Sequence, residues 1–343
     1  MQRLAVIGGG AWGTALAITA ARAGREVVVW AREADAVAAI NQRHENPVFL
    51  PGIAVPVAVT ATGDLATAVD GADAALLVVP SQFLRAISHN MIPILPNGMP
   101  LVICAKGIEA GTGKLMAAVV EDELPNHPLA VLSGPTFASE VAQNMPTAVT
   151  IASDDVEVAG LDSLAGRLST ALATPTFRPY LSDDVTGVEV GGAVKNVLAI
   201  ASGIATGMGF GSNTRAALIT RGLEEIKRLS EALGGRRDTV TGLAGMGDLA
   251  LTCSSEQSRN MSFGKALGEG KSAVDLLSNR SSVVEGVENA RSVTDLAVRL
   301  GVDMPISQAV RAIVHDGRSI QETMTALLNR PIKAEPKGLT LVP

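Results

Sequence analysis

The chain has 343 residues, of which 47% are hydrophobic and 18% are charged, and its formal net charge at pH 7 is −6. A chain of this length usually builds more than one hydrophobic core, so we expect two domains. The acidic balance, with no basic run interleaved with aromatic residues, argues against a surface for nucleic acid or anionic membranes. Cys104 and Cys253 allow at most one disulfide, which favours a reducing compartment.

The N-terminal segment MQRLAVIGGG has neither the apolar core nor the small-residue cleavage site of a signal peptide. The longest apolar runs are interrupted by glycine or polar residues and are too short to span a membrane. We therefore expect a cytoplasmic protein without a membrane span.

Short apolar runs alternate with helical patterns through the first half of the chain. Such runs are typical of strands buried on both faces of a parallel sheet, and we expect strands at residues 4–7, 27–30, 74–79, 101–105, 129–133 and 148–152. Alanine-rich helical patterns cover residues 11–23 and 34–42. The alternation predicts an α/β fold with a doubly wound, Rossmann-type sheet and right-handed crossovers.

The pattern changes near residue 189. Strand-like runs stop there, and long helices rich in Ala, Leu and Gly continue to about residue 329. We therefore predict an N-terminal Rossmann-type domain at residues 1–189 and an all-helical domain at residues 190–343 that contributes substrate binding and catalysis. Residues 331–343 form a short tail with Pro and Lys.

A glycine turn that fits G-x-G-x-x-G follows the first expected strand and precedes a helix. Gly8 permits the tight turn, Gly10 lets the backbone approach a pyrophosphate, and Gly13 allows the helix to pack closely on the strand. The helix N-terminus adds free N–H groups and a positive dipole end. This context predicts a dinucleotide site rather than a glycine turn without a ligand.

The residue after the second expected strand bears on the choice between NAD and NADP. An Asp or Glu at the end of that strand would bind the ribose 2′-hydroxyl, but here the strand is followed by Ala31 and Arg32, with Glu33 next. A cation at this place suits a 2′-phosphate, so NADP is allowed. Arg32 as a solvated surface charge remains the alternative.

Lys195 stands in an otherwise small and apolar run, GGAVKNVLAIAS, at residues 191–202. On a helix, Gly191, Lys195, Ala199 and Ser202 share one face, and a lysine rising from small residues is well placed to reach a ligand. The alternative is a lysine whose stem is buried while its head reaches water.

Two later segments favour the ligand interpretation of Lys195. Asp248 lies in a glycine-rich apolar stretch, where a carboxylate needs a cation, and Arg259 lies between Ser258 and Asn260, a combination that suits phosphate or carboxylate. A helix cap and a surface cation are the simpler alternatives for Asp248 and Arg259. We expect no metal site, because the four histidines are scattered without partners at ligand spacing; they are His44, His89, His127 and His315.

Motifs along nearly the whole chain carry a resemblance to a known family. In order, they are GGGAWGTALA, VVPSQ, AKGIE, SGPTFASE, GGAVKNVLAIASG, GFGSNTRAALITRG, GMGDLALTC, QSRN and VVEG. With these motifs the sequence resembles the bacterial NAD(P)-dependent glycerol-3-phosphate dehydrogenases. The resemblance implies hydride transfer between NAD(P)H and dihydroxyacetone phosphate, giving sn-glycerol 3-phosphate for phospholipid synthesis.

The same resemblance implies roles for individual residues. Lys195 would be the catalytic acid and base, with its pKa lowered by Lys106, Arg259 and partial burial, and with Asp248 as its orienting partner. The implied substrate-binding residues are Lys106, Gly134, Thr136, Lys195, Asp248, Ser258, Arg259 and Asn260. The implied cofactor-binding residues, beside Gly8, Gly10 and Gly13, are Ala11, Trp12, Arg32, Lys106, Ala138, Arg259, Val283 and Glu285.

Related functions remain alternatives at this point. A hydroxyacid or phosphogluconate-type dehydrogenase also pairs a Rossmann domain with a helical domain and a Lys-Asn pair. A UDP-sugar dehydrogenase would need a nucleophilic cysteine, and the sequence around Cys253 shows no recognisable setting for one. A dinucleotide-sensing protein without turnover would have no use for Lys195, Asp248 and Arg259 together. NAD and NADP both remain alternatives for the cofactor, and a homodimer remains an alternative to a monomer.

Overall fold

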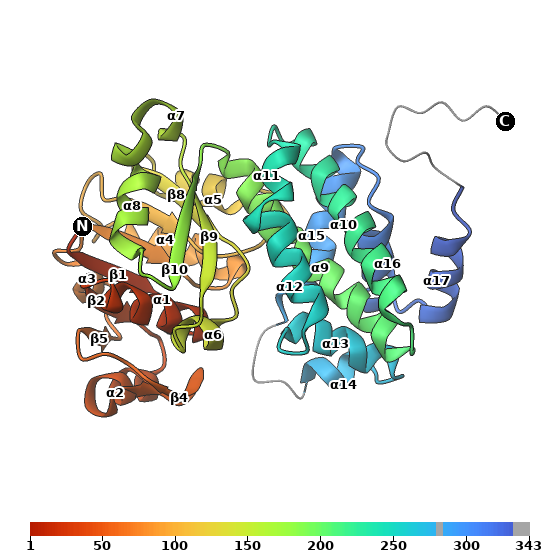
Figure 1. Cartoon of the computed structure of the whole chain (residues 1–343), viewed down its shortest axis with the longest axis horizontal. Helices are drawn as coiled ribbons and strands as arrows, with labels where there is room; N and C mark the ends of the chain where they lie inside the picture. Colours follow the sequence, from red (N-terminus) through yellow and green to blue (C-terminus); the bar gives the residue numbers. More distant parts are fainter. Residues whose placement is uncertain (279–283, 332–343) are drawn as a thin grey trace.

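The protein consists of a sheet half and a helical half that lie side by side, as Figure 1 shows. The computed structural model describes residues 1–278 and 284–331. We use "sheet half" for residues 1–182 and "helical half" for residues 185–331. Val283 and the tail from residue 332 lie outside the described residues.

One eight-stranded sheet organises the sheet half, in the order β10-β9-β8-β7-β6-β1-β2-β5. Its strands are β1 (Arg3–Ile7), β2 (Glu26–Trp30), β5 (Val59–Thr62), β6 (Ala74–Leu77), β7 (Leu101–Ile103), β8 (Leu129–Ser133), β9 (Thr147–Ala152) and β10 (Phe177–Ser182). Neighbouring strands are parallel except for β8 and β9, which are antiparallel. The Rossmann-type α/β fold class is confirmed, with two strands at one edge running against the rest.

Both faces of the sheet are buried, as the apolar runs predict. In β1, Leu4 and Val6 belong to one apolar cluster while Ala5 and Ile7 belong to another, because successive side chains in a strand point to opposite faces. The helices of this half are α1 (Ala11–Arg22), α2 (Ala34–Arg43), α3 (Leu65–Val69), α4 (Leu84–Met91), α5 (Met116–Glu123), α6 (Ala138–Ala142), α7 (Val156–Ala159) and α8 (Leu164–Leu172).

Four strands were not expected from the sequence. They are β5, β10 and the separate antiparallel pair β3 (Glu45–Asn46) and β4 (Leu50–Ala54). β10 is an edge strand in which only Phe177 is fully buried and Pro179 lacks a backbone donor, so it carries no apolar run. The six expected strands are present, two of them ending two residues earlier than predicted, at Leu77 and Ile103.

The helical half is built around α9 (Val185–Gly207), of which most residues are buried. Asp184 caps this helix by accepting a hydrogen bond of 2.8 Å from the Gly187 N–H. Around α9 pack α10 (Ser212–Ala232), α11 (Arg237–Thr241), a π-helical turn η3 (Leu243–Gly247), α12 (Asp248–Ser254), α13 (Arg259–Gly268) and α15 (Glu285–Arg299). α16 (Pro305–Val314) also packs against α9, and the remaining helices are α14 (Ala273–Ser278) and α17 (Ile320–Leu328). Among the described residues after Ser182 the structure has no strand.

α9 is also the one helix of the described chain that is long and apolar enough to cross a membrane, and 94% of its apolar window is buried inside the protein. It is therefore a core helix of the helical half and not a membrane span. The predicted domain boundary at residue 189 falls within α9, which begins at Val185.

Candidate active site

The glycine turn lies between the end of β1 and the start of α1, at the carboxyl edge of the parallel strands. Gly8 has φ +132°, and a Cβ on Gly13 would lie 1.8 Å from the Gly8 carbonyl oxygen, so both positions require glycine. A Cβ on Gly10 would meet nothing within 4 Å, and Gly10 is the N-cap of α1 without a side-chain cap. An open helix N-terminus at a topological switch point fits the pyrophosphate of a dinucleotide.

Ala11 and Trp12 form the first turn of α1 and are half-buried. The buried indole Nε1 of Trp12 makes no hydrogen bond to the residues that the structure describes. Arg32 follows β2, is highly exposed, and pairs with Glu33 at 2.9 Å. The pair is compatible with both interpretations of Arg32, a surface charge and a ligand for a 2′-phosphate.

Lys195 is buried in the helical half, with 7% of the residue exposed. Its Nζ donates to Asp248 Oδ1 at 2.5 Å and to Thr252 Oγ1 at 3.1 Å. Asp248 is fully buried, and its carboxylate binds lysine instead of capping α12, whose N-cap is Gly247. The alternatives of a snorkelling lysine and a capping aspartate are therefore wrong.

Lys106 brings the sheet half to the same carboxylate. It follows β7 in the AKGIE segment, and its Nζ donates to Asp248 Oδ2 at 2.7 Å and to the Gly134 carbonyl at 3.2 Å. Two ammonium groups from different halves of the protein thus share one buried carboxylate. We call Lys106, Asp248 and Lys195 the charged triad.

The environment of Lys195 lowers its pKa to about 8. Burial, which penalises the charged ammonium, is the largest cause, and the positive charge of Lys106 adds to it. The charges of Asp248 and Glu285 act in the opposite direction. A lysine with a pKa near neutrality can both give and take a proton at physiological pH. The expected effect of Arg259 on the pKa of Lys195 stays a prediction. Burial raises the pKa of the Glu285 carboxyl, and the positive charge of Arg259 opposes that rise.

The face of α9 that carries Gly191 and Ser202 packs against η3 and α12. The expectation that this face contacts a ligand is therefore corrected. A Cβ on Gly191 would lie 2.7 Å from the Ala244 carbonyl in η3, and Ser202 Oγ donates to the Cys253 carbonyl at 2.9 Å. The small side chains let η3 and α12 approach closely enough to deliver Asp248 to Lys195. Gly192, on the neighbouring face, makes room for Lys106: a Cβ there would lie 3.4 Å from Lys106 Cγ.

The QSRN segment begins α13. Ser258 caps this helix by accepting from the Met261 N–H at 3.2 Å, and Arg259 is exposed. Asn260 is buried; its Nδ2 donates to Asn196 Oδ1 at 2.9 Å, and Asn196 Nδ2 donates to Glu285 Oε2 at 3.3 Å. The structure thus links Asn260 to Glu285, and burial raises the pKa of the Glu285 carboxyl.

The SGPTFASE segment follows β8 and lies against Lys106. Gly134 has φ +157°, and its carbonyl accepts from Lys106 and, at 3.2 Å, from Thr136 Oγ1. Ala138 begins α6 and is half-buried. Gln257 Nε2 donates to Glu140 Oε1 at 3.0 Å, which ties the QSRN segment to this side of the site.

Two polar contacts of the site were missed at the sequence level. Thr252 lies four residues after Asp248 on α12, a spacing that places both on one helix face and could have revealed it. Asn196 follows Lys195 directly, but only the fold shows that it bridges Asn260 and Glu285. Val283 lies outside the described residues, so its predicted contact stays a prediction.

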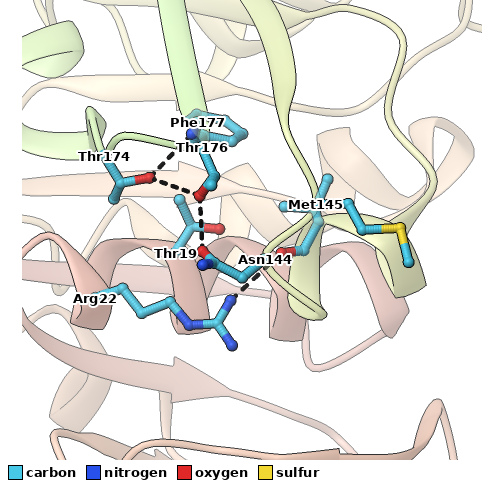
Figure 2. A pocket seen from close by; sticks show the side chains of 8 residues that line it. Thr19, Arg22, Asn144, Met145, Thr174, Thr176 and Phe177 are labelled. Atoms are coloured by element: carbon cyan, nitrogen blue, oxygen red, sulfur yellow. Dashed lines mark hydrogen bonds between the residues drawn. The ribbon is translucent and has the colours of Figure 1, made fainter.

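A small cavity lies elsewhere in the sheet half, between α1, α6 and the start of β10 (Figure 2). At its rim Arg22 donates to the Ala142 carbonyl at 2.7 Å and Thr176 Oγ1 to Asn144 Oδ1 at 2.7 Å. Its volume of about 10 Å³ is enough for about one water molecule. It is therefore no candidate for a substrate site.

Comparisons with known proteins agree with this geometry. A family model described as the NAD-dependent glycerol-3-phosphate dehydrogenase N-terminus matches residues 3–159, and one described as the C-terminus matches residues 184–325. A curated protein of Rhodospirillum rubrum named glycerol-3-phosphate dehydrogenase [NAD(P)+] is 52% identical over 335 residues, covering 98% of this chain and 94% of its own length. A protein of Caulobacter vibrioides with the same name is 51% identical and covers 97% of this chain and 99% of its own length.

Among solved structures, the glycerol-3-phosphate dehydrogenase of Coxiella burnetii is similar to this chain with a TM-score of 0.90 and 40% identity. The match covers 96% of this chain and 99% of that one. Because the two family models together span most of the chain and the relatives match it almost end to end, the chain belongs to the NAD-dependent glycerol-3-phosphate dehydrogenase family and is an oxidoreductase that uses NAD or NADP.

Proposed function

We propose that the protein interconverts dihydroxyacetone phosphate and sn-glycerol 3-phosphate with NAD(P)H or NAD(P)+, and so supplies glycerol phosphate for phospholipid synthesis. The observation that carries the proposal is the charged triad, a buried lysine of lowered pKa held between the two halves at the carboxyl edge of the sheet. Active sites of open α/β sheets lie at this edge.

The dinucleotide is assigned to the glycine turn and the start of α1. The open position at Gly10 and the free N–H groups of the first turn of α1 would hold the pyrophosphate, with Ala11 and Trp12 beside it. When bound, the nicotinamide supplies or accepts the hydride. Arg32, Ala138, Val283 and Glu285 stay assigned to the cofactor as proposals from the family resemblance.

Lys195 is assigned the proton. In the direction of reduction its ammonium donates to the C2 oxygen of the substrate, and in oxidation its neutral amine accepts that proton. Burial and the charge of Lys106 make the ammonium a stronger acid, while Asp248 holds Nζ in place. A proton donor or acceptor of this kind contributes about 10²–10⁴ in rate.

The phosphate is assigned to Arg259 with Ser258 and Asn260. Arg259 is an exposed cation at the first residue of α13, where the positive end of the helix dipole adds to its charge. Lys106, Gly134 and Thr136 stay assigned to the substrate from the family resemblance, and the contact between Lys106 Nζ and the Gly134 carbonyl supports placing them together.

Three coarser assignments complete the proposal. We place the protein in the cytoplasm, consistent with two free, buried cysteines. We retain the domain division at residue 189 and a homodimer as proposals. The partner of the enzyme is its small-molecule substrate, with no nucleic acid.

A steady-state assay tests the function. Purified protein is given dihydroxyacetone phosphate or a panel of 2-keto and 3-keto acids, each with NADH and with NADPH, and cofactor oxidation is followed by the absorbance of the reduced nicotinamide. We expect turnover with dihydroxyacetone phosphate, lost in Lys195→Ala and kept in the matched control Lys271→Ala, whose side chain is 62% exposed. Turnover of a keto acid without phosphate, or full activity of Lys195→Ala, would contradict the proposal.

A further inference from the structure

The carbonyl of Gly9 in the glycine turn is hydrogen-bonded to a side chain that lies 37 residues further along the chain. Asn46, in the short strand β3, is fully buried. Its Nδ2 donates to the Gly9 carbonyl at 2.9 Å and to Thr14 Oγ1 at 2.8 Å. Its Oδ1 accepts from the Phe49 N–H at 3.3 Å, so every polar atom of the amide is used.

Thr14 completes the arrangement from the first turn and a half of α1. Its hydroxyl donates to the Gly10 carbonyl at 2.9 Å while it accepts from Asn46. Gly9 is further fixed by packing, because a Cβ there would lie 2.4 Å from the Ala31 Cβ. The carbonyl groups of Gly9 and Gly10 are therefore both held by side chains inside the protein.

The direction of the Gly9 carbonyl determines the direction of the next N–H group. In a trans peptide the C=O and the following N–H point in opposite directions. Since Asn46 holds the Gly9 carbonyl, the Gly10 N–H points away from Asn46. A Cβ built on Gly10 would meet nothing within 4 Å, so there is open space beside this residue. The Gly10 N–H makes no hydrogen bond to the described part of the chain.

We propose that Asn46 is a positioning residue for the dinucleotide: by holding the Gly9 carbonyl and Thr14, it aims the Gly10 N–H and the first turn of α1 at the pyrophosphate. It acts through the turn and does not touch the cofactor. The inference rests on the assignment of the dinucleotide to this turn, but not on the identity of the substrate.

The test replaces Asn46 by alanine and compares it with Asn41→Ala. Asn41 is a matched control because its amide also makes two hydrogen bonds to backbone, to the Ala61 N–H and carbonyl, each at 2.8 Å, but on β5 and not on the turn. Titration calorimetry measures the Kd for NADPH and for ADP-ribose, which has the pyrophosphate but no nicotinamide. Thermal unfolding without ligand is measured in parallel.

We expect Asn46→Ala to raise both Kd values by about tenfold, because the Gly9 carbonyl loses its partner and the turn its fixed direction. At saturating NADPH, kcat and the KM for dihydroxyacetone phosphate should stay within about twofold of wild type. Asn41→Ala should leave both Kd values unchanged. A lowered melting temperature with unchanged Kd values, or equal Kd changes in the two variants, would overturn the inference.

A second variant covers the case in which Asn46→Ala does not fold. Thr14→Val removes one of the two acceptors of Asn46 and the hydroxyl bound to Gly10, with little change of volume. It should raise the ADP-ribose Kd by about threefold, and an unchanged Kd there would also overturn the inference. Because ADP-ribose binding needs no turnover, failure of the enzyme to reduce dihydroxyacetone phosphate would refute the proposed function and leave this test intact.

Discussion

Replacing Asp248 by asparagine tests the electrostatics of the charged triad. Asp248 lies 2.5 Å from the Nζ of Lys195, and its charge is the largest influence that keeps this lysine protonated. An opposite charge at such a distance changes a pKa by about 1–3 units. Without it, and with Lys106 still nearby, the pKa of Lys195 should fall from about 8 to about 6.

The size of the effect on the reaction follows from the protonated fraction. Reduction of dihydroxyacetone phosphate needs the ammonium form, which is about 90% populated at pH 7 for a pKa of 8 and about 10% for a pKa of 6. Asp248→Asn should therefore lose about tenfold at pH 7 from protonation alone and regain most of that loss at pH 5.5. Oxidation needs the neutral amine, so the midpoint of its pH–rate profile should move to lower pH by the same amount as the pKa of Lys195.

The assay is kcat for reduction between pH 5.5 and 9.5, read as the ratio of variant to wild type so that titration of the substrate phosphate cancels. Lys106→Met is a control that should shift the pKa of Lys195 in the opposite direction, upward, because it removes the neighbouring positive charge. A thermal melt establishes that the variant is folded, since breaking a buried ion pair costs about 3–5 kcal/mol. A loss that is the same factor at every pH would refute the electrostatic reasoning and leave Asp248 with an orienting role alone.

Four further variants have expected outcomes. Lys195→Met should lower kcat by about 10²–10⁴ while the Kd for NADPH stays near that of wild type; a loss confined to Kd would show that the lysine binds cofactor and does not move the proton. Arg259→Ala should raise the KM for dihydroxyacetone phosphate at least tenfold, and a change in kcat alone would contradict a phosphate anchor. Arg32→Ser should raise the KM for NADPH more than the KM for NADH. Equal changes in the two KM values would favour the surface-charge interpretation of Arg32. Burial raises the pKa of Glu225 from 4.5 to about 7, so folding favours its neutral form and the free energy of unfolding should fall as the pH rises from about 4.5 to about 7, by about 1 kcal/mol per pH unit from this group. In urea unfolding between pH 5 and 8, Glu225→Gln should remove this contribution to the change of unfolding free energy with pH. An unchanged pH dependence would contradict the raised pKa of Glu225.

Features that are local in the sequence were predicted well. The strands of the buried sheet are visible in the sequence as short unbroken apolar runs, and the helical half is visible because such strand-like runs stop near residue 189. Lys195 and Asp248 were recognisable because a charge in an apolar helix needs a partner. β10 was missed because an exposed edge strand has no such run.

Contacts between distant segments were beyond the reach of the sequence pattern. Lys106 and Asp248 are 142 residues apart, and no periodicity relates them. Helical spacing correctly grouped Gly191 and Ser202 on one face of α9. It could not show which element covers that face, and η3 and α12 pack there where a ligand was expected. Asn46 carried no signal, because a polar residue before Pro47 is equally typical of an exposed turn.

The charged triad also makes the acidity of the site depend on how closely the two halves approach. The contact between Lys195 and Asp248 lies within the helical half, whereas Lys106 reaches it from the sheet half. Moving the halves apart would remove the charge that helps to lower the pKa of Lys195, so the amine would hold its proton more tightly in an open arrangement. By linkage, a ligand that draws the halves together expels a fraction of a proton near pH 8, and alkaline conditions favour the closed arrangement. Binding heats that vary with the ionisation enthalpy of the buffer would report this proton release.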